Sequence, residues 1–243
     1  MSDKENPDQA EDYDKGSSTQ KKDGHKLLEI VAPEKSIKIL DLGCGTGYFS
    51  KVLADLVGPD GQVVGVDPDG KRIKLAKEKY AASNVVYLEG DIGKISDTDY
   101  DMVFSNYVLH WIKDIDLLLK QACQCLKKGG RFAFVTCCTT VIEKDPSNDS
   151  FSSLNEELLQ RAQGMLFPIP EKDFKELSIL NGFAVNHWEI IQNYWTFETL
   201  ADFIKFYETH FGKAEKFKFE SMNASEQVRI GPTEYIVAIL TKE

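Results

Sequence analysis

Short apolar runs alternate with longer amphipathic stretches along much of this sequence, and this alternation constrains the fold more than any other feature. Each run is short and continuous, which is typical of a strand buried on both faces of a parallel sheet. Five such strands are predicted, at Ile37–Leu42, Gln62–Val66, Val85–Leu88, Tyr100–Ser105 and Arg131–Cys137. The alternation predicts an α/β fold with a doubly wound, Rossmann-like sheet and right-handed crossovers.

Apolar residues at helical spacing predict the helices that accompany these strands. The helices are expected at Gln20–Val31, Tyr48–Val57, Lys71–Ala82, Ile115–Leu126, Glu171–Leu180 and Phe197–Tyr207. Two further strands are expected around Phe183–Tyr194 and at Tyr235–Leu240. Residues 142–166 interrupt the alternation with a polar loop and a short helix, and they are a candidate cap over the site.

Length and charge narrow the class of protein. The 243 residues suit a single domain, which we place at residues 16–243 behind a mobile, acidic segment at residues 1–15. The net charge of −10 disfavours nucleic acid and anionic membranes as partners. No apolar run approaches the ~20 residues of a membrane span, and the five cysteines without a signal peptide indicate reduced thiols. A cytoplasmic protein is expected.

A glycine-rich loop joins the first predicted strand to the helix that follows it, at Asp41–Gly47 (D-L-G-C-G-T-G). In an open parallel sheet, ligands bind beyond the carboxyl ends of the strands, where the strand order reverses. Closely spaced glycines let the backbone approach a ligand without side-chain collisions. The spacing differs from the G-x-G-x-x-G pattern that places a pyrophosphate on a helix N-terminus, which disfavours a nicotinamide dehydrogenase.

Acidic residues after three strands indicate the ligand. Asp41, beside the loop, suits an ammonium group and repels a pyrophosphate, and Asp67 can accept hydrogen bonds from both hydroxyls of a ribose. A ligand with a ribose and a positively charged amino-acid tail is S-adenosylmethionine. Asp91, after the third strand, can accept the adenine amino group, while the N–H of Ile92 serves a ring nitrogen.

With these motifs, roughly residues 20–140 resemble the class I S-adenosylmethionine-dependent methyltransferases. The matching stretches are Asp41–Gly47, Val66–Pro68, Glu89–Asp91 and Tyr100–Asn106. The resemblance implies a seven-stranded sheet whose last strand is antiparallel, and S-adenosylhomocysteine as product. It also implies which residues contact the cofactor: Asp41, Gly43, Cys44, Gly45, Gly47, Asp67, Pro68, Asp91, Ile92 and the backbone of Asn106.

A second, looser resemblance concerns the methyl acceptor. Tyr13, Ser18 and Gln20 before the core, and Trp111 within S-N-Y-V-L-H-W, are similar to positions in small-molecule carboxyl O-methyltransferases. Those enzymes act on juvenile hormone acid, trans-aconitate or the malonyl group of a carrier protein. The resemblance implies that Tyr13 and Ser18 close over the cofactor, while Gln20 and Trp111 hydrogen-bond the acceptor carboxylate.

The chemistry of methyl transfer favours a carboxylate acceptor. A carboxylate is ionised at neutral pH and needs no base, and neutral donors such as Gln20 and Trp111 can orient it for in-line attack. An amine or hydroxyl acceptor needs a base, and His110 is the candidate for that role. Tyr107 is another pocket candidate, and the many aromatic residues after residue 140 suit a hydrophobic acid.

The glycine loop and the acids also fit a protein that binds the cofactor without catalysis and acts as a partner subunit. The cysteines lack zinc-ligand spacing, so no metal site is expected, and Cys44 is interpreted as a small filler of the glycine loop. The acceptor is expected to be a small molecule, and the protein a monomer or homodimer.

Overall fold

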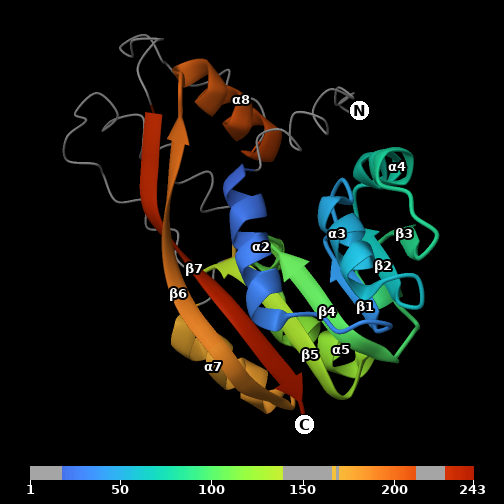
Figure 1. Ribbon diagram of the computed structural model, residues 1–243. Coiled ribbons are helices and arrows are strands. Elements are labelled where there is room, and N and C mark those ends of the chain that lie inside the picture. Colours follow the sequence, from blue (N-terminus) through green and yellow to red (C-terminus); the bar gives the residue numbers. More distant parts are fainter. Residues whose placement is uncertain (1–17, 139–165, 168–169, 212–227) are drawn as a thin grey trace, which may run out of the picture.

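The structure is a computed structural model that describes residues 18–138, 166–167, 170–211 and 228–243. Helices and strands alternate along the chain (Figure 1). In chain order they are α2 (Ser18–Val31), β1 (Lys38–Leu42), α3 (Tyr48–Val57), β2 (Gln62–Asp67), α4 (Gly70–Lys79), β3 (Val85–Glu89), η1 (Ile92–Lys94), β4 (Tyr100–Asn106), η2 (Leu109–Trp111), α5 (Ile115–Cys125), β5 (Leu126–Cys137), α7 (Glu171–Leu180), β6 (Phe183–Phe197), α8 (Leu200–Phe211) and β7 (Val228–Lys242).

The strands form one seven-stranded sheet in the order β3-β2-β1-β4-β5-β7-β6. Strands β1 to β5 pair in parallel, while β7 runs antiparallel to both β5 and β6. The predicted doubly wound sheet with an antiparallel last strand is confirmed. The strand order reverses at β1, which lies between β2 and β4, so the carboxyl end of β1 is where a ligand is expected.

Helices cover both faces of the sheet. On one face, Leu27 of α2 and Leu53 of α3 pack over Phe104 of β4. On the other, Leu118 of α5 and Phe174 of α7 pack in a second cluster of buried side chains. Because side chains alternate across a strand, each buried strand contributes to both layers, which explains the continuous apolar runs in the sequence.

The ends of two helices differ from the predictions. Helix α4 ends at Lys79, before the predicted end at Ala82. Helix α8 begins at Leu200 because β6 continues through Phe197. Thr199 and Asp202 then exchange hydrogen bonds between their side chains and backbone N–H groups, which caps the start of α8.

The last strand is much longer than predicted. Strand β7 begins at Val228 rather than Tyr235, and it pairs with β5 only from Tyr235 to Thr241. Its earlier part pairs with β6 alone, as far as Phe197 opposite Val228. Beyond the end of β5 the two strands therefore continue as a two-stranded ribbon, with α8 near its far end (Figure 1).

Two predicted segments lie outside the described residues. They are the acidic segment at residues 1–15 and, except for Leu166, the candidate cap at residues 142–166. None of the helices in the described ranges is both long enough and apolar enough to cross a membrane.

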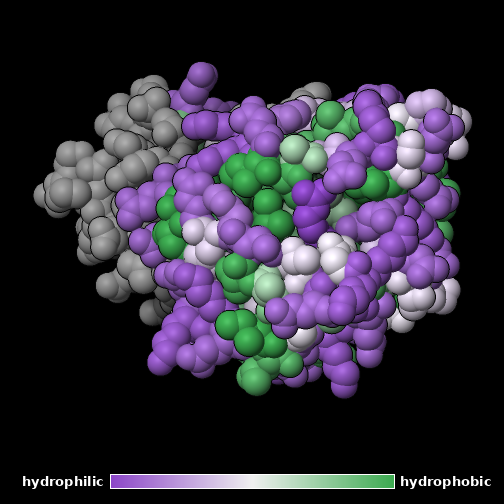
Figure 2. Space-filling model, turned by 60° about the horizontal axis from the view of Figure 1, so that its bottom comes forward, coloured by the Kyte–Doolittle hydropathy of each residue, from purple (hydrophilic) through white to green (hydrophobic). Residues whose placement is uncertain are grey.

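Apolar side chains on the surface lie in several groups between hydrophilic residues, as the side shown in Figure 2 illustrates. Among the large apolar residues that are exposed, Leu180 at the end of α7 is 80% exposed and Leu117 of α5 is 48% exposed. Exposed apolar residues of this kind are ordinary on a surface that faces water.

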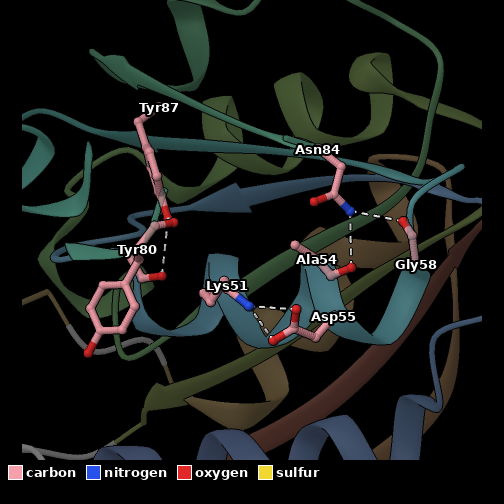
Figure 3. Close-up of polar contacts among 8 residues, drawn as sticks. Lys51, Ala54, Asp55, Gly58, Tyr80, Asn84 and Tyr87 are labelled. Carbon is pink, nitrogen blue, oxygen red and sulfur yellow. Dashed lines mark hydrogen bonds and ion pairs between the residues drawn. The ribbon is translucent and has the colours of Figure 1, made fainter. Parts of the chain in front are cut away.

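Asn84 connects the start of β3 to the end of α3. Its side-chain amide donates to the carbonyl oxygens of Ala54 and Gly58 at 3.1 and 2.9 Å (Figure 3). Since a net hydrogen bond contributes roughly 1 kcal/mol, we expect Asn84→Ala to lower the free energy of unfolding by about 1–2 kcal/mol in urea denaturation.

The control for this prediction is the ion pair between Lys51 and Asp55 on the exposed side of α3 (Figure 3). Exposed pairs at this spacing contribute about 0.3–0.5 kcal/mol. Lys51→Ala should therefore cost clearly less than Asn84→Ala. Equal losses in the two variants would show that the Asn84 bonds add no more than a surface contact.

Candidate active site

The glycine-rich loop lies at the carboxyl end of β1 and is bonded to the end of β2. The N–H groups of Gly43 and Cys44 donate to the carbonyl oxygen of Val66 at 2.8 and 3.0 Å. The N–H of Gly45 donates to a carboxylate oxygen of Asp67 at 2.9 Å. The loop is thus held in one conformation by the backbone and carboxylate of the neighbouring strand.

The three glycines of the loop have positive φ angles, which L side chains rarely adopt. A Cβ at Gly43 would lie 2.3 Å from a methyl group of Val108, and a Cβ at Gly47 would lie 2.7 Å from the hydroxyl of Tyr87. At Gly45 the same Cβ would have no described atom within 4 Å. The outer glycines are therefore needed for packing, whereas at Gly45 the described residues leave open space.

Asp41 is a buried acid beneath this loop. It is 2% exposed, and one carboxylate oxygen accepts a hydrogen bond from the Ser50 hydroxyl at 2.6 Å. Burial raises the pKa of Asp41 to about 7, and the nearby charge of Asp67 adds to this effect. A cation next to Asp41 and Asp67 would favour the charged form of both carboxylates, whereas a pyrophosphate would be repelled.

Asp67 lies at the end of β2, where the sequence places a ribose contact. It is buried, and its oxygens accept from the N–H groups of Gly45 and Asp69, both at 2.9 Å. Burial raises its pKa, opposed by these hydrogen bonds. Each carboxylate oxygen has a second lone pair, so Asp67 can hold the loop and still accept from a ligand. Pro68, which follows it, is exposed.

The proposed adenine contacts lie at the end of the neighbouring strand. Asp91 follows β3 and is exposed, while Ile92 begins η1 and is 5% exposed. Strand β3 pairs in parallel with β2, with Glu89 opposite Asp67. Parallel pairing thus brings Asp91 and Asp67 to the same edge of the sheet.

Asn106, at the end of β4, connects the sheet to α2. Its side-chain N–H donates to the backbone oxygen of Gln20 at 3.1 Å. Its Oδ1 is buried and has no hydrogen-bond partner among the described residues. The structure therefore brings Gln20, a predicted acceptor contact, to the carboxyl end of β4.

His110 and Trp111 lie on η2, just after β4. His110 is buried, and its Nδ1 accepts the N–H of Cys137 at 3.1 Å and lies 3.2 Å from the hydroxyl of Thr136. An Nδ1 that accepts a backbone N–H carries no proton, so the ring is neutral with its proton on Nε2. This geometry disfavours His110 as a base. Trp111 is half-buried, with its ring 5.6 Å from that of His110.

The structure describes the remaining predicted site residues less completely. Ser18 is the first residue of α2, but its side chain is not among those described, and Tyr13 lies outside the described residues. Cys44 is buried, and burial raises the pKa of its thiol far above the usual range, which fits an inert filler. No group of three or more metal-binding side chains occurs within the described ranges.

One polar cluster was not predicted from the sequence. Tyr107 donates its hydroxyl proton to Asp23 of α2, and the side chain of Asn193 on β6 donates to the same carboxylate oxygen. A signal was present, since Asp23 lies four residues before Leu27 and therefore on the apolar side of α2. Tyr107, predicted to line a pocket, is 5% exposed and belongs to this cluster.

These features fit S-adenosylmethionine. The open space at Gly45 leaves room for a ligand against the backbone, and the Asn106 oxygen lacks a partner among the residues described. The buried acids Asp41 and Asp67 suit a cationic ligand with hydroxyl groups.

The comparison with protein families agrees with this site. A family model described as a methyltransferase domain matches residues 33–192. A malonyl-(acyl-carrier protein) O-methyltransferase of Priestia megaterium is 29% identical over 208 residues, covering 77% of this chain and 75% of that protein. The enzyme with the same name from Acetivibrio thermocellus is 34% identical over 130 residues, covering 52% and 46%. The chain therefore spans about half the length of that second relative.

Solved structures share the fold. A putative methyltransferase from Bacillus halodurans matches with a TM-score of 0.65 and 18% identity, covering 91% of this chain and 99% of that one. An S-adenosylmethionine-dependent methyltransferase from Mesorhizobium loti matches with a TM-score of 0.59 and 21% identity, covering 88% and 95%. At these identities the likeness concerns the fold alone.

The raised pKa of Asp41 gives a prediction for stability. The pKa is 3.8 for an ordinary aspartate and about 7 in the folded protein, so the folded state holds the proton more tightly. Stability therefore falls as pH rises from about 4 to about 7. Asp41→Asn keeps an acceptor for Ser50 but cannot ionise, so it should unfold like the wild type near pH 4. At pH 8 it should be more stable by at least about 1 kcal/mol.

Urea denaturation of the ligand-free proteins at the two pH values tests this expectation. The other buried acids are present in both proteins, so their effects cancel in the difference. A variant that is less stable than the wild type at pH 8 would contradict the prediction.

Proposed function

Because the chain belongs to the family of methyltransferase domains, we propose that it transfers the methyl group of S-adenosylmethionine to the carboxylate of a small molecule. The described part of residues 16–243 forms one sheet with its helices, and we propose that this range acts as a single domain. The names of two relatives support the type of acceptor, since both are malonyl-(acyl-carrier protein) O-methyltransferases and a malonyl group on a carrier has a free carboxylate.

The carboxyl ends of β1 to β4 hold the cofactor in this proposal. Asp41 and the loop with Gly43, Cys44, Gly45 and Gly47 face the methionine part, and the Asn106 backbone lies near it. Asp67 and Pro68 border the ribose, and Asp91 with Ile92 borders the adenine. Tyr13 and Ser18 close over it from the N-terminal side. When bound, the cofactor supplies an electrophilic methyl group on a positively charged sulfur.

The observation that carries the choice of a carboxylate is the hydrogen bonding of His110. Its Nδ1 accepts the Cys137 N–H, so this ring nitrogen is not available to take a proton from an amine or a hydroxyl. A carboxylate is ionised without help at neutral pH. The remaining task is to hold one oxygen in line with the methyl group, which neutral donors such as Gln20 and Trp111 can do.

An aromatic cluster favours an acceptor with an apolar part. Phe197, at the end of β6, lies 5.4 Å from Phe203 and 5.1 Å from Phe206 between ring centroids. Leu200, Phe203 and Tyr207 of α8 are buried. We propose that this end of the β6–β7 ribbon borders the acceptor and selects a hydrophobic acid.

The nature of the product tests the proposal. The protein should transfer labelled methyl groups from S-adenosylmethionine to carboxylic acids but not to matched amines or phenols. The label should be released by mild base, because esters hydrolyse there while methylamines and aryl ethers do not. A base-stable product would contradict carboxyl methylation and favour an amine or hydroxyl acceptor. Absence of S-adenosylhomocysteine formation with every acceptor would favour a non-catalytic binding protein.

The ribose contact gives a separate prediction. Asp67→Ala removes charge-assisted hydrogen bonds to the cofactor and the anchor of the Gly45 N–H. Calorimetry with S-adenosylhomocysteine should show affinity weaker by about 1–3 kcal/mol. The control is Asp69→Ala, which removes a cap of α4 but leaves the Asp67 carboxylate and the Asp69 N–H in place. Unchanged affinity in Asp67→Ala would refute the assignment.

A further inference from the structure

We infer that Asp23, Tyr107 and Asn193 are positioning residues that hold the first turns of α2 against the end of β4, and so set the place of Gln20 in the acceptor site. The inference rests on the proposed function in that it assigns Gln20 to the acceptor. The three residues touch neither acceptor nor cofactor in this scheme, and they act through the elements that they join.

The cluster joins elements that are far apart in the sequence. One oxygen of Asp23 accepts from the Tyr107 hydroxyl and from the Asn193 amide. The Asn193 amide also lies 3.3 Å from the Tyr107 hydroxyl, which closes a triangle of hydrogen bonds. Helix α2, the residue after β4 and the outer strand β6 therefore meet at one point.

Burial makes these bonds strong and specific. Asp23 is 3% exposed and Tyr107 is 5% exposed. A buried carboxylate is costly unless it is hydrogen-bonded, and bonds to a charged acceptor are stronger than neutral ones. Burial raises the pKa of Asp23, while the bonds from Tyr107 and Asn193 and the charges of Lys22 and Lys26 lower it.

The backbone of Tyr107 connects the cluster to Trp111, the other residue predicted to contact the acceptor. Tyr107 has a φ of 63°, a left-handed conformation that is costly for a residue with a bulky side chain. Its N–H donates to the carbonyl oxygen of Val135 at 2.8 Å, which fixes this turn against β5. The chain then enters η2, which carries Trp111. The turn therefore sets the direction in which Trp111 is presented.

The two halves of α2 are held by different interactions. Leu27, Leu28 and Val31, in the second half, lie in the apolar core. Gln20 lies in the first half, where the Asn106 amide holds its backbone oxygen and Asp23 follows within one turn. Loss of the polar cluster should therefore loosen the turn that carries Gln20 while the core half of the helix stays in place.

Tyr107→Phe is the first test, with Tyr100→Phe as a matched control at the other end of β4. Tyr100 is also buried, at 1% exposure, and the change is the same. At a temperature where all proteins are folded, Tyr107→Phe should lower kcat/KM for the acid by about tenfold or more, because a small misplacement of reacting groups is enough for such a loss. Affinity for S-adenosylhomocysteine should fall clearly less than kcat/KM, because in the proposed function the loosened turns of α2 border that ligand only through Ser18, whereas Gln20 holds the acceptor itself.

An exchange of carboxylate and amide is the second test. Asn193→Asp alone places two carboxylates together and should be the most impaired variant. Asp23→Asn alone weakens the bonds by removing the charge. The double variant Asp23→Asn/Asn193→Asp restores one carboxylate and one amide, with the Tyr107 hydroxyl still between them. The kcat/KM of the double variant should be at least about tenfold higher than that of Asn193→Asp. Two independent sites would not show this recovery, because their effects would simply add.

The outcomes separate this inference from the proposed function. Unchanged kcat/KM in Tyr107→Phe would overturn the inference, as would a loss of cofactor affinity as large as the loss of kcat/KM. It would also be overturned if the effects of Asp23→Asn and Asn193→Asp simply added in the double variant. If the wild type methylates no acid, hydrogen exchange of the ligand-free protein still decides. Amides in the first half of α2 should exchange faster in Tyr107→Phe than in Tyr100→Phe, while those around Leu28 should not change. Equal exchange in both variants would overturn the inference whatever the substrate.

Discussion

The bonding of the glycine loop to the end of β2 is the interaction on which the site depends. A loop with three glycines has more conformational freedom than other loops, and the sheet removes that freedom with the Val66 carbonyl and the Asp67 carboxylate. The same carboxylate is the proposed ribose contact. In the proposed function Asp67 therefore both holds the glycine loop and contacts the cofactor, and the pairing of β1 with β2 brings it next to both.

Much of this arrangement was predictable because it is local. The strand β1, the loop and Asp67 lie in one βαβ unit, and the apolar runs, glycine spacing and terminal acids of that unit are visible in the sequence. The alternation of strands and helices predicted the doubly wound sheet, and the resemblance to known methyltransferases implied its antiparallel last strand. The structure confirms the predicted fold.

The features that could not be predicted depend on contacts between distant segments. Asn193 lies 86 residues from Tyr107, and only the path of β6 brings the two together. The hydrogen bond between Cys137 and His110 also needs the register of β5 against η2, so the sequence left His110 open as a base. The early start of β7 was hidden by Gly231 and Pro232, which usually interrupt strands.

The two-stranded ribbon of β6 and β7 has a consequence for how such a protein can change over time. Its outer part is bonded to no other strand of the described sheet, whereas the glycine loop lies several strands away at β1. Insertions, deletions or altered aromatic residues at the ribbon's far end leave the register of β1, β2 and β4 untouched. Under the proposed function, related proteins can therefore acquire new acceptors by remodelling the β6–β7 ribbon, while the strands that hold the methyl donor keep their arrangement.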